Sequence, residues 1–404
     1  MTEKLPGCAD AKAEIPASNA NKHTNGFIHL PNADLLLSEP LDTKLRQKLH
    51  LRSFFAPSII HISVPMTIPF PKLPFWMRKL TQLWRLVRES HAQPLAGTPF
   101  RPPRISTGDT SITFIGHSSF LIQTAGRALL IDPVFATRLI LLRRQRRPGI
   151  RIADLPSIDA VLLTHAHMDH LNRPSLRAII REMRRRCLPA PIAIVPKGVE
   201  DLVNDMGFAR IETLEWWQST RLNPAPRAAD PKPHFIDTHP QSAPAGHDSA
   251  ATITITATPA RHWGARMFND THRGFGGYVI ASPNTPTIYH SGDTAYFSGF
   301  TEIGRRLHPE IALLPIGAYF PDSYRSVHTS PEEALRAFID LNADIMIPMH
   351  YGTFRLGREP MDEPLPRLLR AADRAGISDR IAPLTEGESR TARTSQLLER
   401  DGTA

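Results

Sequence analysis

The residues with the clearest capacity for chemistry are three histidines and an aspartate in the run THAHMDH, at positions 164–170. His165, His167, Asp169 and His170 come directly after a short apolar segment that predicts a buried strand. Because alternate residues of an extended chain point the same way, His165 and His167 can converge on one metal ion. Asp169 and His170 lie beyond a turn and can reach a second ion. Imidazole and carboxylate groups are ligands that zinc accepts where thiolates are lacking, so the run predicts a metal site.

Three more residues of ligand type also follow predicted strands. His262 comes after TITITATPAR, Asp293 ends TIYHSGD and His350 ends ADIMIPMH. In α/β proteins, residues that follow strands gather at one rim of the sheet, where active sites commonly lie. A catalytic site with two metals needs such further ligands and an open position for water. We therefore expect these three residues to join the four of the run in one centre.

The elements around these residues predict an α/β fold. Residues 111–135 indicate two or three short strands around a turn at 125–127, and further strands are expected at 159–165, 252–258, 287–293 and 343–350. One helix opens at Pro174 and another at Ser330, which begins a capping box. The first helix is expected to carry Leu176, Ile179, Ile180 and Met183 on one face, and the second is expected to run through Leu335, Phe338 and Ile339. Alternation of strands and helices is typical of the α/β class.

We expect four segments along the chain. They are a disordered tail at 1–50, an apolar and basic segment at 51–105, the main domain at 106–390 and a C-terminal tail at 391–404. Residues 223–249 are rich in proline and lack periodicity, which predicts a flexible surface insertion in the main domain. The histidines of this insertion are expected to be exposed, and they are His234, His239 and His247.

The segment at 51–105 carries two signals. Residues 53–71 lack formal charge but contain four prolines, which argues against a membrane-spanning helix. Residues 73–89 place Trp76, Trp84 and several leucines among arginines and a lysine, a pattern that predicts an amphipathic helix. Such a helix either packs on the main domain or lies on a membrane surface.

Composition limits the classes of partner. The net charge of +9 includes arginine-rich runs at 142–151 and 181–187, but neither run belongs to a recognisable nucleic-acid module, so no nucleic-acid partner is expected. We expect these arginines on solvated helix and loop faces, with attraction to anionic lipid or phosphate as the alternative. The two cysteines, Cys8 and Cys187, exclude a disulfide framework and a cysteine zinc site, and they favour a reducing, cytoplasmic compartment.

The same motifs resemble the metallo-β-lactamase superfamily. HAHMDH, a later single histidine, GDT and MHYG are similar to its pattern, and the resemblance implies a four-layer αββα sandwich with a dinuclear site at one rim. More specifically, IGHSSFLI, LPSIDAVLLTHAHMDHL, PIGAYFP, HTSPEEA and MHYGTF resemble the N-acyl-phosphatidylethanolamine-hydrolysing phospholipase D family, in order from about residue 70 to 390. HxHxDH alone marks the superfamily, whereas PIGAYFP followed by HTSPEEA is more selective.

The resemblance implies a role for each site residue. The ligands of one Zn²⁺ would be His165, His167 and His262, and those of a second Zn²⁺ would be Asp169, His170 and His350. Asp293 would bridge the two ions, and Asp132 would support a ligand imidazole from behind. The implied catalytic residues are Asp169 and His328, with His328 giving a proton to the departing ethanolamide oxygen. The alternative for His328 is an ordinary surface histidine before a capped helix.

The implied reaction is hydrolysis of N-acyl phosphatidylethanolamine to phosphatidic acid and an N-acylethanolamine, through metal-activated water that attacks phosphorus. The rival enzymes are a lactonase and a phosphodiesterase with another, soluble or nucleic-acid substrate. A non-catalytic metal-binding protein is the rival from a different class, although it would be expected to have lost ligands. Iron and manganese accept similar ligands to zinc. Peripheral contact with a membrane and a homodimer are both left open.

Overall fold

The computed structural model describes residues 75–92, 94–106, 108–223, 251–267 and 269–392. The chain divides into the units Met1–Leu73 and Pro74–Ala404, and the description below concerns the second unit. Several sequence expectations lie outside the described residues: the tail at 1–50, nearly all of the insertion at 223–249 with His234, His239 and His247, and residues 393–404.

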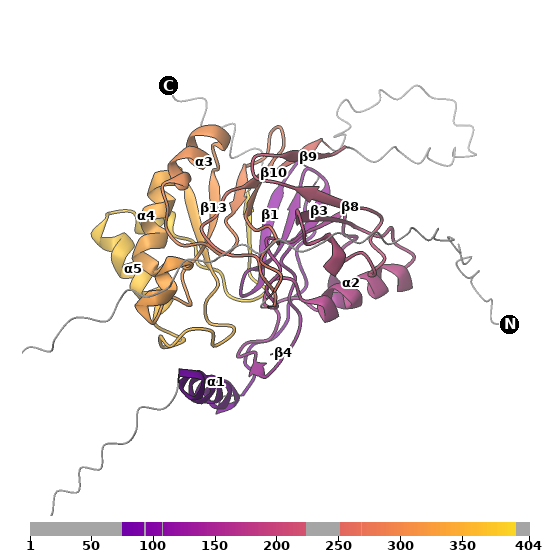
Figure 1. The fold of residues 1–404 in the computed structure, drawn as a ribbon. Coiled ribbons are helices and arrows are strands. Elements are labelled where there is room, and N and C mark those ends of the chain that lie inside the picture. Colours follow the sequence, from indigo (N-terminus) through magenta and orange to yellow (C-terminus); the bar gives the residue numbers. More distant parts are fainter. Residues whose placement is uncertain (1–74, 93, 107, 224–250, 268, 393–404) are drawn as a thin grey trace, which may run out of the picture. The chain divides into compact units, whose positions relative to one another are not determined.

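Two β-sheets form the centre of the unit (Figure 1). The first contains, in order across the sheet, β15 (Ser389–Ala392), β1 (Thr110–Gly116), β2 (Ser119–Thr124), β3 (Arg127–Ile131), β6 (Ala160–Leu162), β7 (Ile192–Pro196) and β8 (Ile211–Leu214). The second contains β14 (Ile345–Met349), β13 (Ile311–Pro315), β12 (Ile288–His290), β11 (Gly277–Ala281), β10 (Ile253–Thr258) and β9 (Ser219–Leu222). A separate hairpin joins β4 (Arg138–Leu139) and β5 (Leu142–Arg143). The predicted strands are therefore present.

The α-helices of the described residues are α1 (Phe75–Ala92), α2 (Arg173–Arg185), α3 (Gly299–Leu307), α4 (Pro331–Leu341) and α5 (Pro364–Arg374). Short 3₁₀ helices span Ile152–Asp154, Glu200–Leu202, Asp322–Ser326 and Ser378–Arg380. Apolar residues of α2 pack against the outer face of the first sheet, and those of α3, α4 and α5 pack against the outer face of the second. The layers are therefore helix, sheet, sheet and helix, which confirms the αββα expectation.

The side-chain alternation of the strands explains why both faces of each sheet are buried. In β2, Phe120 and Ile122 enter the core between the sheets, while Leu121 points to the other face, toward the cluster that includes α2. In the second sheet, Ile255 of β10 meets the same inter-sheet core, and Leu314 of β13 meets the helices outside. This apolar layer packs the two sheets face to face and fixes their position relative to each other.

Both predicted helices form, as α2 and α4, and α4 contains Leu335, Phe338 and Ile339 as expected. The capping box is complete, because Ser330 Oγ accepts from the Glu333 backbone N–H and the Glu333 carboxylate accepts from the Ser330 N–H. Ile339, however, is 51% exposed and not part of the core. The buried arc of α4 is centred on Ala334 and Phe338, and Ile339 lies on the flank of that arc.

The expectation that the arginines of 142–151 are solvated is wrong for Arg144, whose side chain is fully buried. Its guanidinium donates to the carbonyl oxygens of Val134 at 2.7 Å, Arg146 at 2.7 Å and Ile115 at 3.2 Å. Val134 and Arg146 lie outside the strands and Ile115 lies near the end of β1, and a donor with several N–H groups reaches all three carbonyls together. Arg144 therefore joins the end of β1 to the loop that follows β3.

The amphipathic segment forms a helix, α1, which packs on the β4–β5 hairpin. Ser90 Oγ accepts from the Arg143 N–H at 3.1 Å, and Gln145 Nε2 donates to the Ser90 carbonyl at 2.7 Å. Leu86 is buried, whereas Trp84 is 69% exposed. The buried Leu86 fits the expectation that the helix packs on the main domain, and the exposed Trp84 fits the alternative that it lies on a membrane surface. Among the described residues, none of the helices combines the length and apolar character needed to cross a bilayer.

Candidate metal centre

Strand direction brings the candidate ligands to the same end of the strands in each sheet. In the first sheet β1 and β3 both run antiparallel to β2, and β6 runs parallel to β3. In the second sheet β10 and β12 both run antiparallel to β11, and β12, β13 and β14 are parallel. The strands that precede site residues therefore all point the same way within their sheet, and their C-terminal ends lie on the same side of it. The residues that follow these ends are His117, Asp132, His165, His167, Asp169, His170, His262, Asp293 and His350.

The first group of donors consists of His165, His167 and His262. Nδ1 of His167 lies 2.9 Å from Nε2 of His165 and 3.2 Å from Nε2 of His262. Nitrogens that bind one ion tetrahedrally at 2.0–2.1 Å lie about 3.3 Å apart, so these spacings suit a shared metal. Nδ1 of His165 donates to Thr164 Oγ1 at 2.9 Å and Nδ1 of His262 donates to the Val327 carbonyl at 2.9 Å. These bonds leave the inward Nε2 of each ring unprotonated, as a ligand must be.

The second group is built around Asp169, with His170 and His350 on either side. Asp169 Oδ2 lies 3.7 Å from Nε2 of His170 and 3.6 Å from Nε2 of His350. Asp132 is buried behind His170 and accepts from its Nδ1 at 2.7 Å, while the Thr164 N–H and hydroxyl donate to the same carboxylate. This contact directs the free nitrogen of His170 toward the centre, which is the supporting position expected for Asp132.

Asp293 lies between the two groups. Its Oδ2 is 3.0 Å from Nε2 of His350 and 3.2 Å from Nε2 of His170, and 4.0 Å from Nε2 of both His165 and His262. Its other oxygen, Oδ1, and the Nε2 atoms of His170 and His350 are buried and make no hydrogen bond within the described part of the chain. Buried polar atoms of this kind are costly unless a partner is supplied, and a metal ion is a partner that suits all three.

The electrostatics of the centre also favour a cation. Burial alone would lower the pKa of His170, but the carboxylates of Asp293, Asp169 and Asp132 outweigh it and hold that pKa well above the ordinary value. The same balance, with Asp293 and Asp169, raises the pKa of His350 to about 9. Without a metal, these carboxylates therefore draw protons onto two rings. A divalent cation would replace those protons, as metal binding does in other proteins.

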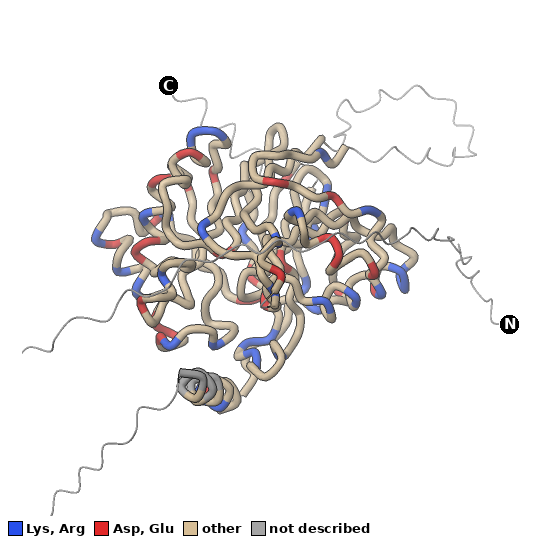
Figure 2. The backbone as a smooth tube through the Cα atoms, in the orientation of Figure 1, with Lys and Arg blue, Asp and Glu red and all other residues tan. Residues whose placement is uncertain are grey.

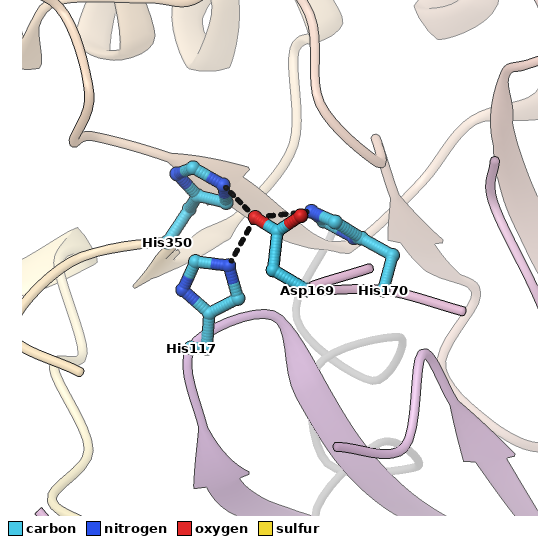
Figure 3. A group of neighbouring side chains, drawn as sticks. All are labelled: His117, Asp169, His170 and His350. Atoms are coloured by element: carbon cyan, nitrogen blue, oxygen red, sulfur yellow. Dashed lines mark hydrogen bonds and ion pairs between the residues drawn. The ribbon is translucent and has the colours of Figure 1, made fainter. Parts of the chain in front are cut away.

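Figure 3 shows a contributor that the sequence reasoning did not assign, His117. Its Nε2 lies 3.0 Å from Asp169 Oδ2, and its ring centroid is 4.2 Å from that of His350. Burial lowers the pKa of His117 to about 3, so the ring is neutral and donates one N–H to Asp169. The signal was available, because IGHSSF places a histidine directly after a strand, as for the other site residues.

His328 lies at the border of the centre and not on the open surface. Its Nδ1 is 3.8 Å from Asp293 Oδ2, and its ring stacks on that of His350 with centroids 5.4 Å apart. His328, Asp293 and His350 also form a set of side chains close enough to hold an ion. Burial lowers the pKa of His328 to about 4, which makes it neutral at pH 7. A neutral ring can still donate a hydrogen bond to a substrate oxygen.

Comparison with known proteins places this geometry in a family. A model of the Beta-lactamase superfamily domain matches residues 127–351, which include all seven candidate ligands. The chain belongs to this superfamily. Matched relatives include metal-dependent hydrolases, and the chain is accordingly a metal-dependent hydrolase of the metallo-β-lactamase fold.

Two relatives and one solved structure give the range of similarity. An uncharacterized protein of Mycobacterium tuberculosis is 32% identical over 72% of this chain and 73% of its own length. A mitochondrial N-acyl-phosphatidylethanolamine-hydrolyzing phospholipase D of Saccharomyces cerevisiae is 28% identical over 66% of this chain, which spans only 53% of that relative. The structure of a possible metal-dependent hydrolase from Veillonella parvula shares the fold, with a TM-score of 0.51, 18% identity, and coverage of 70% of this chain and 99% of that one.

Proposed function

We propose that this protein is a dinuclear zinc phosphodiesterase of phospholipase D type that hydrolyses N-acyl phosphatidylethanolamine. The observation that carries the proposal is the presence of two adjacent donor groups that share Asp293. Two metals held a few ångströms apart suit in-line displacement at phosphorus, because they can serve both the attacking and the leaving oxygen. The motifs PIGAYFP and HTSPEEA and the similarity to the yeast phospholipase D support the choice of substrate.

The residues present fit two Zn²⁺ ions, since the donors are imidazole nitrogens and carboxylate oxygens. His165, His167 and His262 would hold one ion, and Asp169, His170 and His350 the other, with Asp293 between them. When bound, such ions activate water and neutralise charge on a phosphoryl group. Asp132 and His117 hold His170 and Asp169 in place through the hydrogen bonds described above. His328 would donate its ring N–H to the oxygen of the leaving ethanolamide.

A largely apolar cavity of about 850 Å³ supports a substrate with long apolar chains. Its lining includes Tyr351 and Gly352, the residues that follow the candidate ligand His350 in the chain, but none of the candidate ligands themselves. Apolar walls come from Phe114 and Leu365, and α1 forms one side. Pockets of this size and character hold largely apolar ligands. A phospholipid partner implies at least peripheral contact with a membrane, and neither a nucleic-acid partner nor an obligatory homodimer is part of the proposal.

The test is a substrate comparison with the purified full-length protein supplied with Zn²⁺. We expect release of phosphatidic acid and an N-acylethanolamine from N-acyl phosphatidylethanolamine, detected by mass spectrometry. Bis(p-nitrophenyl) phosphate and an N-acyl homoserine lactone are the competing substrates, and Asp293→Asn is the inactive control. Hydrolysis of the lactone alone, or of the soluble phosphodiester with the lipid untouched, would show the proposed substrate to be wrong. Metal content without any hydrolysis would favour the non-catalytic alternative.

A further inference from the structure

The β4–β5 hairpin ends in two exposed apolar side chains. Ile140 is 72% exposed and Leu141 is 49% exposed, and together they form the two-residue connection between the strands. Single exposed apolar residues are common on protein surfaces, but a pair at the tip of a projecting loop is a more specific feature. Neither residue belongs to the apolar cluster between the two sheets or to the cluster between α2 and the first sheet.

Ile140 and Leu141 are not the residues that a two-residue hairpin turn normally favours. Of the two connecting residues only Ile140 has a positive φ, which is the pattern of a type II′ turn, and glycine is the usual residue at that position. Ile140 has a φ of +52°, which is unfavourable for a β-branched side chain. A strained position that keeps an apolar residue exposed points to a role for the side chain outside the hairpin.

The hairpin is held firmly at its base and lies next to the metal centre. Leu139 is buried against Val134 and Phe354, and the second strand is hydrogen-bonded to α1 through Ser90. The Phe354 ring lies 5.3 Å from the ring of His117, which in turn contacts the candidate ligand Asp169. A rigid base and a projecting tip would fix the distance between the metal centre and whatever the tip contacts.

The charges around the tip identify the partner. Arg138 and Arg143 flank it on the two strands, and Figure 2 shows the basic residues of this hairpin beside α1. On α1, Arg88 lies one turn beyond the exposed Trp84. Apolar side chains within a basic rim match a bilayer with anionic headgroups. A second copy of this chain, with its net charge of +9, would bring like charges together at this surface.

We propose that the Ile140–Leu141 tip inserts into the surface of an anionic membrane and holds the metal centre next to the lipid. The surface extends over Ile140, Leu141, Arg138 and Arg143. This proposal specifies the partner of the proposed phospholipid hydrolase and in that respect rests on that function, but insertion itself is measured without catalysis.

The test compares Ile140→Gly/Leu141→Asn with the unaltered protein in flotation with vesicles. Glycine is favoured at the first position of this turn and asparagine is common at the second, so the variant is expected to fold at least as well as the original. Ile339→Gln/Leu369→Gln, which removes two exposed apolar residues from α4 and α5, is the matched control. Vesicles contain either phosphatidylcholine alone or phosphatidylcholine with phosphatidylglycerol, at low and high NaCl.

We expect the unaltered protein and the control to bind the anionic vesicles, more weakly at high salt, and the tip variant to bind at least about ten-fold more weakly. Activity on bis(p-nitrophenyl) phosphate should be equal in all three. Equal vesicle binding by the tip variant, or no binding by the unaltered protein, would overturn the proposal. So would conversion of a dimer to a monomer by the tip variant, seen in sedimentation, because the tip would then bind a second copy. If vesicle binding depends on the tip but the lipid is not hydrolysed, the proposed function is rejected, while the proposal that the tip inserts into a membrane is supported.

Discussion

Asp293 Oδ2 lies within 4.0 Å of imidazole nitrogens from both donor groups, and this position leads to a prediction at the scale of single residues. Asp293→Asn should cost more activity than His328→Ala, because the carboxylate serves both ions, whereas a proton donor contributes about 10² to 10⁴ in rate. Elemental analysis should separate the two variants, with metal lost from the first and kept in the second. Full zinc occupancy in Asp293→Asn would contradict the bridging role.

His117 leads to a second prediction at this scale. His117→Ala removes the N–H that holds Asp169, so metal affinity should fall by about 10- to 100-fold, as for other residues that support ligands. His117→Gln should recover part of the affinity, because an amide can also donate to the carboxylate. His272→Ala changes an exposed histidine and serves as the control. Competition with a chromogenic chelator measures the affinity, and unchanged affinity in His117→Ala would reject the supporting role.

At the scale of elements, α1 presents one buried and one exposed face, so its function can be tested through the exposed face alone. Trp84→Ser should weaken vesicle binding while activity on a short-chain soluble analogue and the melting temperature stay the same, because this side chain contributes little to the core. The exposed Leu369→Ser on α5 is the comparison. A lower melting temperature together with loss of soluble activity would instead assign Trp84 to the packing of the domain. The second tryptophan of the original pattern, Trp76, has a side chain outside the described set.

At the scale of the whole molecule, the metal should contribute to the stability of the fold. Both sheets supply ligands, so an ion would join them, and a ligand at 100 times its Kd stabilises the native state by about 2.7 kcal/mol. For a domain of this size, that corresponds to a change in melting temperature of about 4–5 °C. Treatment with EDTA followed by dialysis should lower the melting temperature accordingly. Restoration by Zn²⁺ but not by Mn²⁺ or Fe²⁺ would identify the metal, whereas an unchanged melting temperature after verified metal removal would exclude a structural contribution.

Much of the fold and of the candidate centre could be predicted because the relevant signals are local. Neighbouring residues determine the apolar strands and the capping box at Ser330, and each candidate ligand lies in the segment that follows a strand. The helical pattern placed Ile339 in α4 but did not decide its exposure, because the burial of a residue on the flank of a helical stripe depends on what packs against it. The expected solvation of Arg144 was wrong because its carbonyl partners Val134 and Ile115 belong to other parts of the chain, which only the folded structure brings to the guanidinium.

The sequence by itself determined the α/β class, the αββα architecture through its family motifs, and the types of side chain offered to a metal, because these depend on short-range pattern and residue chemistry. Only the tertiary structure decided which nitrogen of His165 and His262 faces the centre and that His117 contacts Asp169. The exposure of Ile140 and Leu141 at the tip of the hairpin was also decided only there. These features arise where two stacked sheets bring together segments that are far apart in the chain. Residues so separated meet only through packing, and no local pattern records which of them will be neighbours.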